Sequence, residues 1–270
     1  MKGNGDFMGK ISLQMYTMRD FTKTPAELNN TLERLKEIGF STLQYSVPDS
    51  FDTAEVKKMF DSVGIKNDSV FCPCLELENR EKKIIGECEM FETDFVRTNS
   101  IPAGLSSSPA GYKMFAHYLN EVTAGLKKEG KKLLYHFHAF EFIRFGNTTG
   151  IEILINETNP EAVQLIPDTH WIHSGGKSII GFLEKYSDRY EYIHTKDFAI
   201  GNMGAQLEMR PILFAPVGEG NIEWDNILAF CKKKGVKSYA IEQDDCYGRD
   251  PFDCVKSSFD YLKRAGVESE

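Results

Sequence analysis

A chain of 270 residues with 41% hydrophobic and 27% charged residues has the composition of a globular protein with a substantial core, folded as one large α/β domain or as two ordinary domains. Its formal net charge of −8 argues against binding to nucleic acid or to an anionic membrane, either of which calls for a basic face, so we expect a small-molecule partner. The sequence shows neither the apolar core of a signal peptide nor an apolar run of membrane-spanning length, which predicts a cytoplasmic protein.

Hydrophobic periodicity predicts strands and helices that alternate along the whole chain. In the first half, four strands are each followed by a helix, over residues 10–16 and 24–39, 41–46 and 52–64, 65–74 and 76–91, and 93–100 and 108–130. In the second half, the same order is predicted over residues 133–143 and 149–158, 162–168 and 178–188, 190–197 and 224–235, and 237–244 and 250–266. Strands that alternate with helices in this way favour a parallel sheet.

Eight strand–helix units match the number that closes a parallel barrel. The predicted fold class is therefore α/β, a (β/α)8 TIM barrel in a single domain over residues 1–270. The main interruption is the segment 198–221, which contains glycine and proline and has no clear period. It follows the seventh strand, on the face where such barrels keep their active sites, and is predicted to be a long loop that covers or contacts substrate.

Ionisable side chains stand at the carboxyl ends of the last four predicted strands, where barrels of this kind carry their chemistry. These residues are His136, His138, Glu141, Asp168, His194 and Glu242. Taken singly, Asp168 could cap a helix, His194 could be a neutral core histidine, and Glu141 could be a solvated loop residue. Glu242 is harder to explain in this way, because it leaves an apolar strand where an unpaired carboxylate is costly.

The convergence of these groups on one end of a barrel would crowd three negative charges together, and a bound divalent cation is the simplest way to make that tolerable. Carboxylates with one imidazole form a site rich in oxygen that suits Mn²⁺, Mg²⁺, Co²⁺ or Fe²⁺, with Zn²⁺ also possible. The six cysteines lack paired ligand spacing, so a structural zinc site is not expected and the thiols are predicted to be reduced.

Several motifs together resemble the sugar phosphate isomerase/epimerase superfamily of xylose-isomerase-like barrels. They are "ISLQMYTMRD", "YHFHAFEF", "DTHW", "IHTKD", "FAPVGEGNIEW" and "IEQDD", and they extend over nearly the whole chain. The resemblance implies one metal ion held from the last four strands, with ligands at Glu141, Asp168, His194 and Glu242. An alignment anchored earlier on the fifth strand makes His136 or His138 the first ligand instead.

The resemblance also implies how the site would work on a sugar that carries neighbouring hydroxyl and keto groups. Chelation of the sugar acidifies the C–H beside the carbonyl, and Glu141 and Glu242 act both as ligands and as acid/base groups. His138 is a further catalytic candidate. The residues expected to orient the substrate are His136, Trp171, Lys196 and Asp197. A tryptophan at this position could equally pack the turn from strand to helix.

The activity expected from the resemblance is a metal-dependent isomerase or epimerase that acts on a keto-sugar or related polyol through an enediolate. The alternative is a metal-dependent lyase on the same fold, a dehydratase like inosose dehydratase or an enzyme that cleaves 3-keto-glycosides. The histidines at 136 and 138 favour this alternative, because imidazole can protonate a leaving group near neutral pH. The expected partner is a small carbohydrate, and a homo-oligomer is possible.

Overall fold

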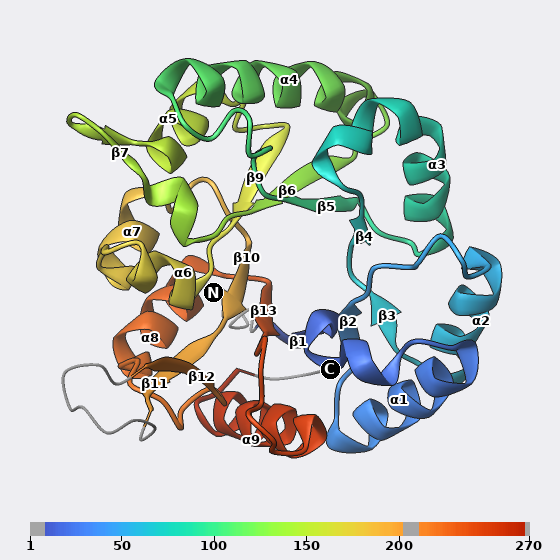
Figure 1. Cartoon of the computed structure of the whole chain (residues 1–270). Coiled ribbons are helices and arrows are strands. Elements are labelled where there is room, and N and C mark those ends of the chain that lie inside the picture. The colour runs from blue at the N-terminus through green and yellow to red at the C-terminus, as the bar shows by residue number, and fades with distance from the viewer. Residues whose placement is uncertain (1–8, 202–210, 268–270) are drawn as a thin grey trace, which may run out of the picture. The chain divides into compact units, whose positions relative to one another are not determined.

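The computed structural model describes residues 9–201 and 211–267 (Figure 1). Their contacts divide the chain into two compact units, which we call the terminal unit and the central unit. The terminal unit is built from the described parts of Met1–Gln44, Lys58–Lys66 and Tyr192–Glu270. The central unit is built from Tyr45–Lys57 and Asn67–Glu191.

A parallel sheet forms the core of the terminal unit, with strand order β10-β13-β1-β2-β3. These strands are β1 (Lys10–Gln14), β2 (Thr42–Gln44), β3 (Lys66–Asn67, at the border of the units), β10 (Tyr192–Thr195) and β13 (Ser238–Ile241). In the register of β10 with β13, Thr195 is opposite Ile241, and in that of β1 with β2, Gln14 is opposite Gln44. Parallel pairing therefore gathers the residues that follow these strand ends at one edge of the sheet.

The helices of the terminal unit include α1 (Pro25–Ile38), α8 (Trp224–Lys234) and α9 (Pro251–Arg264), while α2 (Thr53–Val63) crosses the border of the units. Helix α1 begins at a capping box, in which the Thr24 side chain accepts from Glu27 N and the Glu27 carboxylate accepts from Thr24 N. It ends at Gly39, whose φ of +121° is one that residues with a side chain rarely adopt. The predicted boundaries of this helix are confirmed to within one residue.

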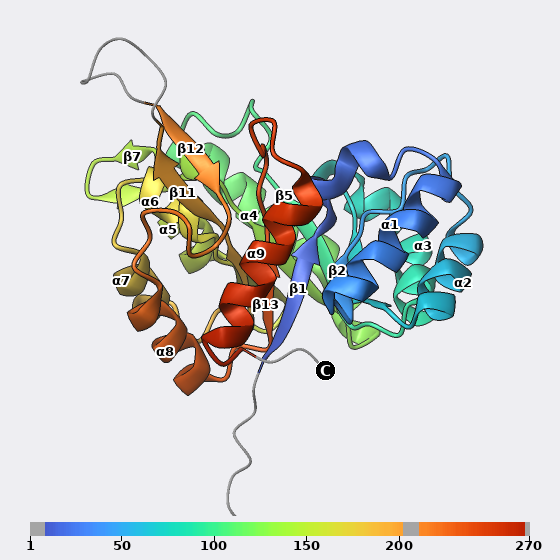
Figure 2. The same cartoon turned by 90° about the horizontal axis from the view of Figure 1, so that it is seen from below.

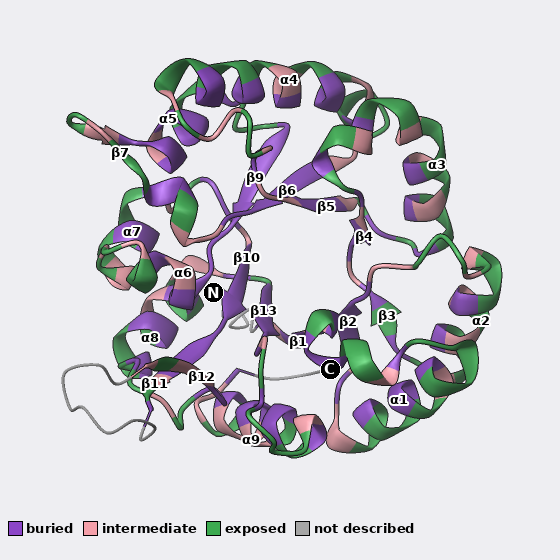
Figure 3. Ribbon diagram, viewed as in Figure 1, coloured by how far each residue is buried: buried purple, intermediate pink, exposed green. Residues whose placement is uncertain are grey.

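The central unit contains a second parallel sheet, with strand order β4-β5-β6-β9. Its strands are β4 (Val70–Phe71), β5 (Phe95–Asn99), β6 (Lys132–His136) and β9 (Val163–Ile166), and its helices are α3 (Leu77–Met90), α4 (Pro109–Lys128), α5 (Gly150–Glu157), α6 (Thr169–Ser174) and α7 (Ile179–Lys185). Helices α3 and α4 pack against this sheet (Figure 1). The strands are largely buried, and helices such as α4 alternate buried and exposed residues at helical spacing (Figure 3).

Short 3-10 helices and two hairpins lie where the sequence predicted strand or loop. The 3-10 helices are η1 (Met15–Phe21), η2 (Cys74–Glu76) and η3 (Ala139–Phe142), and one hairpin pairs β7 (Arg144–Phe145) with β8 (Thr148–Thr149). The predicted strand 133–143 was therefore too long, since β6 ends at His136. Its apolar residues continue because the turn of η3 also packs inward, with Glu141 and Phe142 buried.

The predicted loop 198–221 contains a second hairpin, in which β11 (Asp197–Ile200) pairs antiparallel with β12 (Ile212–Ala215) (Figure 2). The two strands are short apolar runs that lie far apart in this segment, and a reading of local period does not detect their pairing. Residues 202–210, at the centre of the predicted loop, lie outside the described residues. No helix in the described part of the chain has the length and apolar character needed to cross a membrane. All six cysteines are buried and free of disulfide bonds.

Candidate active site

In the central unit, a histidine and an aspartate meet at the carboxyl ends of β6 and β9. The register pairs His136 with Ile166, so Asp168, two residues further along, is brought to the same edge. His136 Nε2 lies 3.3 Å from Asp168 Oδ2, and both side chains are buried. The other oxygen, Asp168 Oδ1, accepts from Trp171 N at 3.0 Å. Asp168 is thus the N-cap of α6 and at the same time one half of what we call the central pair, His136–Asp168.

Glu141, the expected ligand from the fifth strand, is directed elsewhere. Its Oε1 accepts from the Tyr135 hydroxyl and its Oε2 accepts from His138 N, each at 2.7 Å, and its side chain is fully buried. Neighbouring residues of a strand point to opposite faces, so a contact with Tyr135 places Glu141 on the face away from His136. Tyr135 itself packs against Phe115 of α4. The strand-end residue that faces Asp168 is therefore His136, the alternative that the sequence left open.

Burial gives Glu141 an unusual pKa, which leads to a prediction for stability. Burial raises the pKa of Glu141 to about 7, although the bonds from Tyr135 and His138 lower it. The folded protein therefore holds this proton more tightly than the unfolded chain, and the stabilisation is present at low pH and lost as pH rises toward 7. In metal-free protein, we expect the free energy of unfolding to fall by about 3 kcal/mol between roughly pH 4.5 and pH 8 through this group.

Urea titrations of the wild type and of Glu141→Gln at several pH values measure this effect. The variant has no proton to lose at this position, so its stability should decline less than that of the wild type over the same interval. Glu129→Gln, at an exposed position, should keep the pH dependence of the wild type. Parallel pH curves for the wild type and Glu141→Gln would contradict the raised pKa.

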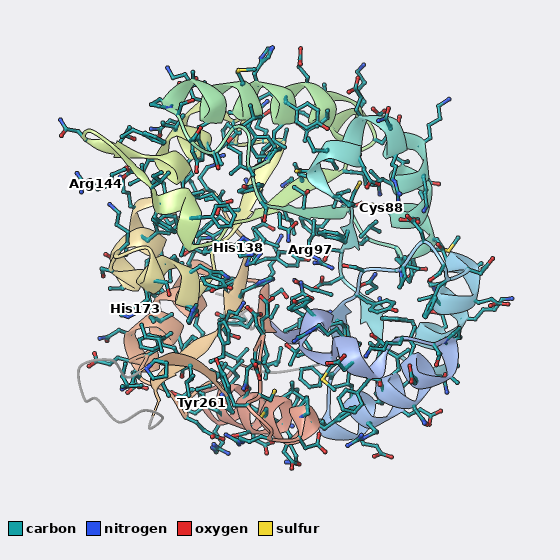
Figure 4. All side chains as sticks on the ribbon, in the orientation of Figure 1. Cys88, Arg97, His138, Arg144, His173 and Tyr261 are labelled. Carbon is teal, nitrogen blue, oxygen red and sulfur yellow. The ribbon has the colours of Figure 1, made fainter. Side chains whose placement is uncertain are left out.

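His138 follows the end of β6 (labelled in Figure 4) and is partly accessible to solvent. Its ring stacks on Phe140 at an interplanar angle of 7°, and its centroid lies 5.4 Å from that of Trp171. Its Nδ1 lies 3.4 Å from Ser100 Oγ. The stack on Phe140 and the bond from its backbone N–H to Glu141 hold His138 at the strand end, and the Trp171 ring lies beside it.

In the terminal unit, a second histidine meets a glutamate. His194 lies on β10 and Glu242 follows β13, and His194 Nδ1 is 2.8 Å from Glu242 Oε2. On the other side of the ring, His194 Nε2 is 2.8 Å from Gln44 Oε1. All three side chains are buried, with Gln44 and His194 fully so. We call His194–Glu242 the terminal pair. Sequence reasoning missed Gln44, although a glutamine that ends a buried strand was a usable signal.

Lys196 and Asp197 follow His194 along the chain but have different surroundings. Lys196 is 1% exposed, and its Nζ lies 2.7 Å from Asp244 and 3.6 Å from Glu242. Its ammonium therefore offsets the charge of the buried Glu242 carboxylate and of the partly buried Asp244 carboxylate. Asp244 was not among the predicted site residues.

Asp197 was expected to orient substrate, but its carboxylate is occupied by donors of its own unit. The donors are the Trp224 indole and the backbone N–H groups of Phe198, Gly218, Gly220 and Ile222, at 2.7 to 3.3 Å. A carboxylate that accepts five hydrogen bonds has its lone pairs satisfied. We therefore assign Asp197 to holding the turn from Gly218 to Trp224 in place.

The two pairs have the chemistry of ligands for a divalent cation. A carbonyl oxygen only accepts, so the bond to Gln44 places the proton of His194 on Nε2 and leaves a lone pair on Nδ1, facing an oxygen of Glu242. Two acceptors at 2.8 Å repel one another unless a cation, either a proton or a metal ion, lies against both. Nitrogen and carboxylate oxygen together suit Zn²⁺, Mn²⁺, Fe²⁺ or Co²⁺. The fold and these side chains thus define an α/β protein whose strand ends carry histidine–carboxylate pairs fit for a metal.

The chain belongs to the xylose isomerase-like TIM barrel family, whose model matches residues 32–265. This match confirms the predicted α/β TIM-barrel fold. The inosose dehydratase of Geobacillus kaustophilus is 30% identical over 146 residues, which are 50% of this chain and 46% of the relative. Other bacterial relatives carry the same name, and the chain spans about half the length of the curated relatives that it matches first.

Two solved structures share this fold. A sugar phosphate isomerase/epimerase from Parabacteroides distasonis is similar with a TM-score of 0.77 and 21% identity, covering 99% of this chain and 98% of the other. A protein named IOLI, solved with a bound zinc atom, is similar with a TM-score of 0.71 and 15% identity, covering 97% of this chain and 100% of the other. At these identities the likeness concerns the fold.

Proposed function

We propose that this protein binds a divalent metal ion through its buried histidine–carboxylate pairs, His136–Asp168 in the central unit and His194–Glu242 in the terminal unit. Each pair offers an imidazole nitrogen and a carboxylate oxygen as ligand atoms. The set keeps three of the four ligands implied by the sequence resemblance and replaces Glu141 by His136. The zinc atom in the structurally similar IOLI protein supports a metal on this fold.

We further propose that the reaction is the removal of water from a cyclic polyol that carries a keto group. The bound metal would polarise the carbonyl and acidify the neighbouring C–H. The relatives named inosose dehydratase favour this reaction over isomerisation or epimerisation, and the site offers groups for it. The alternative, an isomerase or epimerase, draws support from the isomerase/epimerase among the structurally similar proteins.

In the proposed elimination, two side chains of the chain handle protons. The Glu242 carboxylate removes the proton next to the carbonyl, and the electrons of that C–H bond form a carbon–carbon double bond. Hydroxide leaves from the next carbon and takes a proton from His138 in its protonated, imidazolium form, which becomes neutral imidazole as one water is lost. Lys196 and Trp171 are proposed to orient the substrate, through its oxygens and its ring face respectively. The partly accessible His138, fixed by Phe140 and Glu141, is the observation that carries this proposal.

Incubation in D₂O with a keto-cyclitol such as inosose, and with keto-hexoses, tests the proposal directly. Dehydration should give a product lighter by one water, with the new ultraviolet absorption of a conjugated enone. An isomerase or epimerase would exchange carbon-bound hydrogen for deuterium without losing water. Protein treated with a chelator should do neither until Zn²⁺, Mn²⁺ or Co²⁺ is added back. Deuterium exchange without loss of water would replace the dehydratase by the isomerase or epimerase.

A further inference from the structure

We infer that Gln44 is a positioning residue that determines which nitrogen of His194 binds the cation. Its side-chain carbonyl accepts from Nε2–H, so that Nδ1 is the nitrogen left to share the metal with Glu242. The inference rests on the metal site of the proposed function. It concerns contacts inside the terminal unit alone, where His194 on β10 and Glu242 after β13 belong to neighbouring strands and Gln44 ends β2 of the same sheet.

The tautomer of a neutral histidine follows from its partners. One ring nitrogen carries the proton and the other carries the lone pair that a metal requires. With the Gln44 carbonyl oxygen 2.8 Å from Nε2, the proton is on Nε2 and Nδ1 faces Glu242 Oε2. In metal sites, a histidine ligand usually donates the N–H of its other ring nitrogen to an acceptor, and this hydrogen bond orients the ring and makes the ligating nitrogen more basic.

The opposite orientation of the Gln44 amide would close the site. Its NH₂ group would then donate to Nε2, the proton would move to Nδ1, and Nδ1–H would donate to Glu242. Neither nitrogen of His194 would then present a lone pair to a cation. The orientation of one buried amide therefore decides whether the terminal pair can bind metal.

A second observation indicates that the Gln44 side chain serves a polar contact and does not merely fill space. The amide nitrogen of Gln44 is buried and has no hydrogen-bond partner among the residues that the structure describes. Burial of an amide N–H₂ without a partner costs about 1–3 kcal/mol. A leucine of similar size would avoid that cost, so packing alone does not account for glutamine at this position. The bond to His194 is the interaction that does.

The neighbouring strand supplies a matched control. Gln14 lies opposite Gln44 in the register of β1 and β2, and its side chain instead accepts from Tyr16 N at 2.9 Å. Gln14→Met and Gln44→Met thus make the same chemical change at adjacent positions. Only the second removes a partner of His194.

The experiment measures zinc affinity by calorimetry, and the bound nitrogen of His194 by NMR on ¹⁵N-histidine-labelled protein, with His194→Ala identifying the signal. The wild type should show zinc on Nδ1 and a proton on Nε2. Gln44→Met should bind zinc about 10- to 100-fold more weakly, as expected for loss of a hydrogen bond behind a ligand, while Gln14→Met stays at the wild-type affinity. Gln44→Glu keeps an acceptor and should retain zinc on Nδ1.

Three results would overturn the inference. They are zinc on Nε2 in the wild type, unchanged affinity in Gln44→Met, and zinc on Nε2 in Gln44→Glu. The Gln44→Glu spectrum decides the matter even if Gln44→Met does not fold. Because zinc alone is the probe, these results are distinct from failure of the proposed dehydration, which would leave zinc binding and its dependence on Gln44 intact.

Discussion

Glu242→Gln should abolish turnover while the protein stays folded. The substitution keeps the size of the side chain but removes its charge, so the amide can neither take a proton from carbon nor bind a cation with full strength. Loss of general base catalysis alone lowers kcat about 10²- to 10⁴-fold, and weaker metal binding adds to that loss. Steady-state kinetics with saturating metal measure the loss of turnover, and circular dichroism measures whether the variant stays folded.

Glu223→Gln is the matched control for this variant. It makes the same substitution in the same unit at an exposed residue, and it should retain wild-type activity and stability. The packing around Glu242 gives a further reason to expect a folded variant, since Lys196 keeps its shorter contact with Asp244 at 2.7 Å. Full activity in Glu242→Gln would remove Glu242 from both the catalytic and the metal-binding proposals.

His136→Ala should lose the metal, whereas Glu141→Gln should keep it. In the structure, His136 faces Asp168 at 3.3 Å and Glu141 is bonded to Tyr135 on the other face of the strand. Elemental analysis of purified protein should therefore find about one equivalent of metal in the wild type and in Glu141→Gln, and almost none in His136→Ala. The result distinguishes His136 from Glu141, two of the three candidates at the end of β6 that the sequence could not separate.

Thermal unfolding provides an independent measure of the same loss. A ligand at 100 times its Kd stabilises the folded state by about 2.7 kcal/mol, so chelation should lower the Tm of the wild type and of Glu141→Gln. His136→Ala should show almost no further decrease on chelation. His117→Ala, at an exposed position on α4, should behave as the wild type. Metal retained in His136→Ala and lost in Glu141→Gln would restore Glu141 as the ligand.

Much of the fold was predictable, because the period of apolar residues reflects burial directly. Helices α1, α4, α8 and α9 have the boundaries expected from their amphipathic faces, to within a residue or two, and proline or glycine marks an end of each. The hairpin of β11 and β12 was not predicted, because its two short strands are far apart in the sequence and a local hydrophobic period does not reveal that they pair. The end of β6 was also missed, because the apolar residues of η3 continue the pattern of a buried strand.

The sequence by itself determined which residue types carry the chemistry, namely histidines and carboxylates at the ends of successive buried strands, because a strand that ends in an ionisable group is visible in a linear pattern. It could not decide which of His136, His138 and Glu141 faces Asp168, nor reveal Gln44 behind His194. Those choices depend on where β6 stops and on which strands are neighbours. A shift of one residue sends a strand side chain to the opposite face, so only the tertiary structure places Glu141 against Tyr135 and His136 against Asp168.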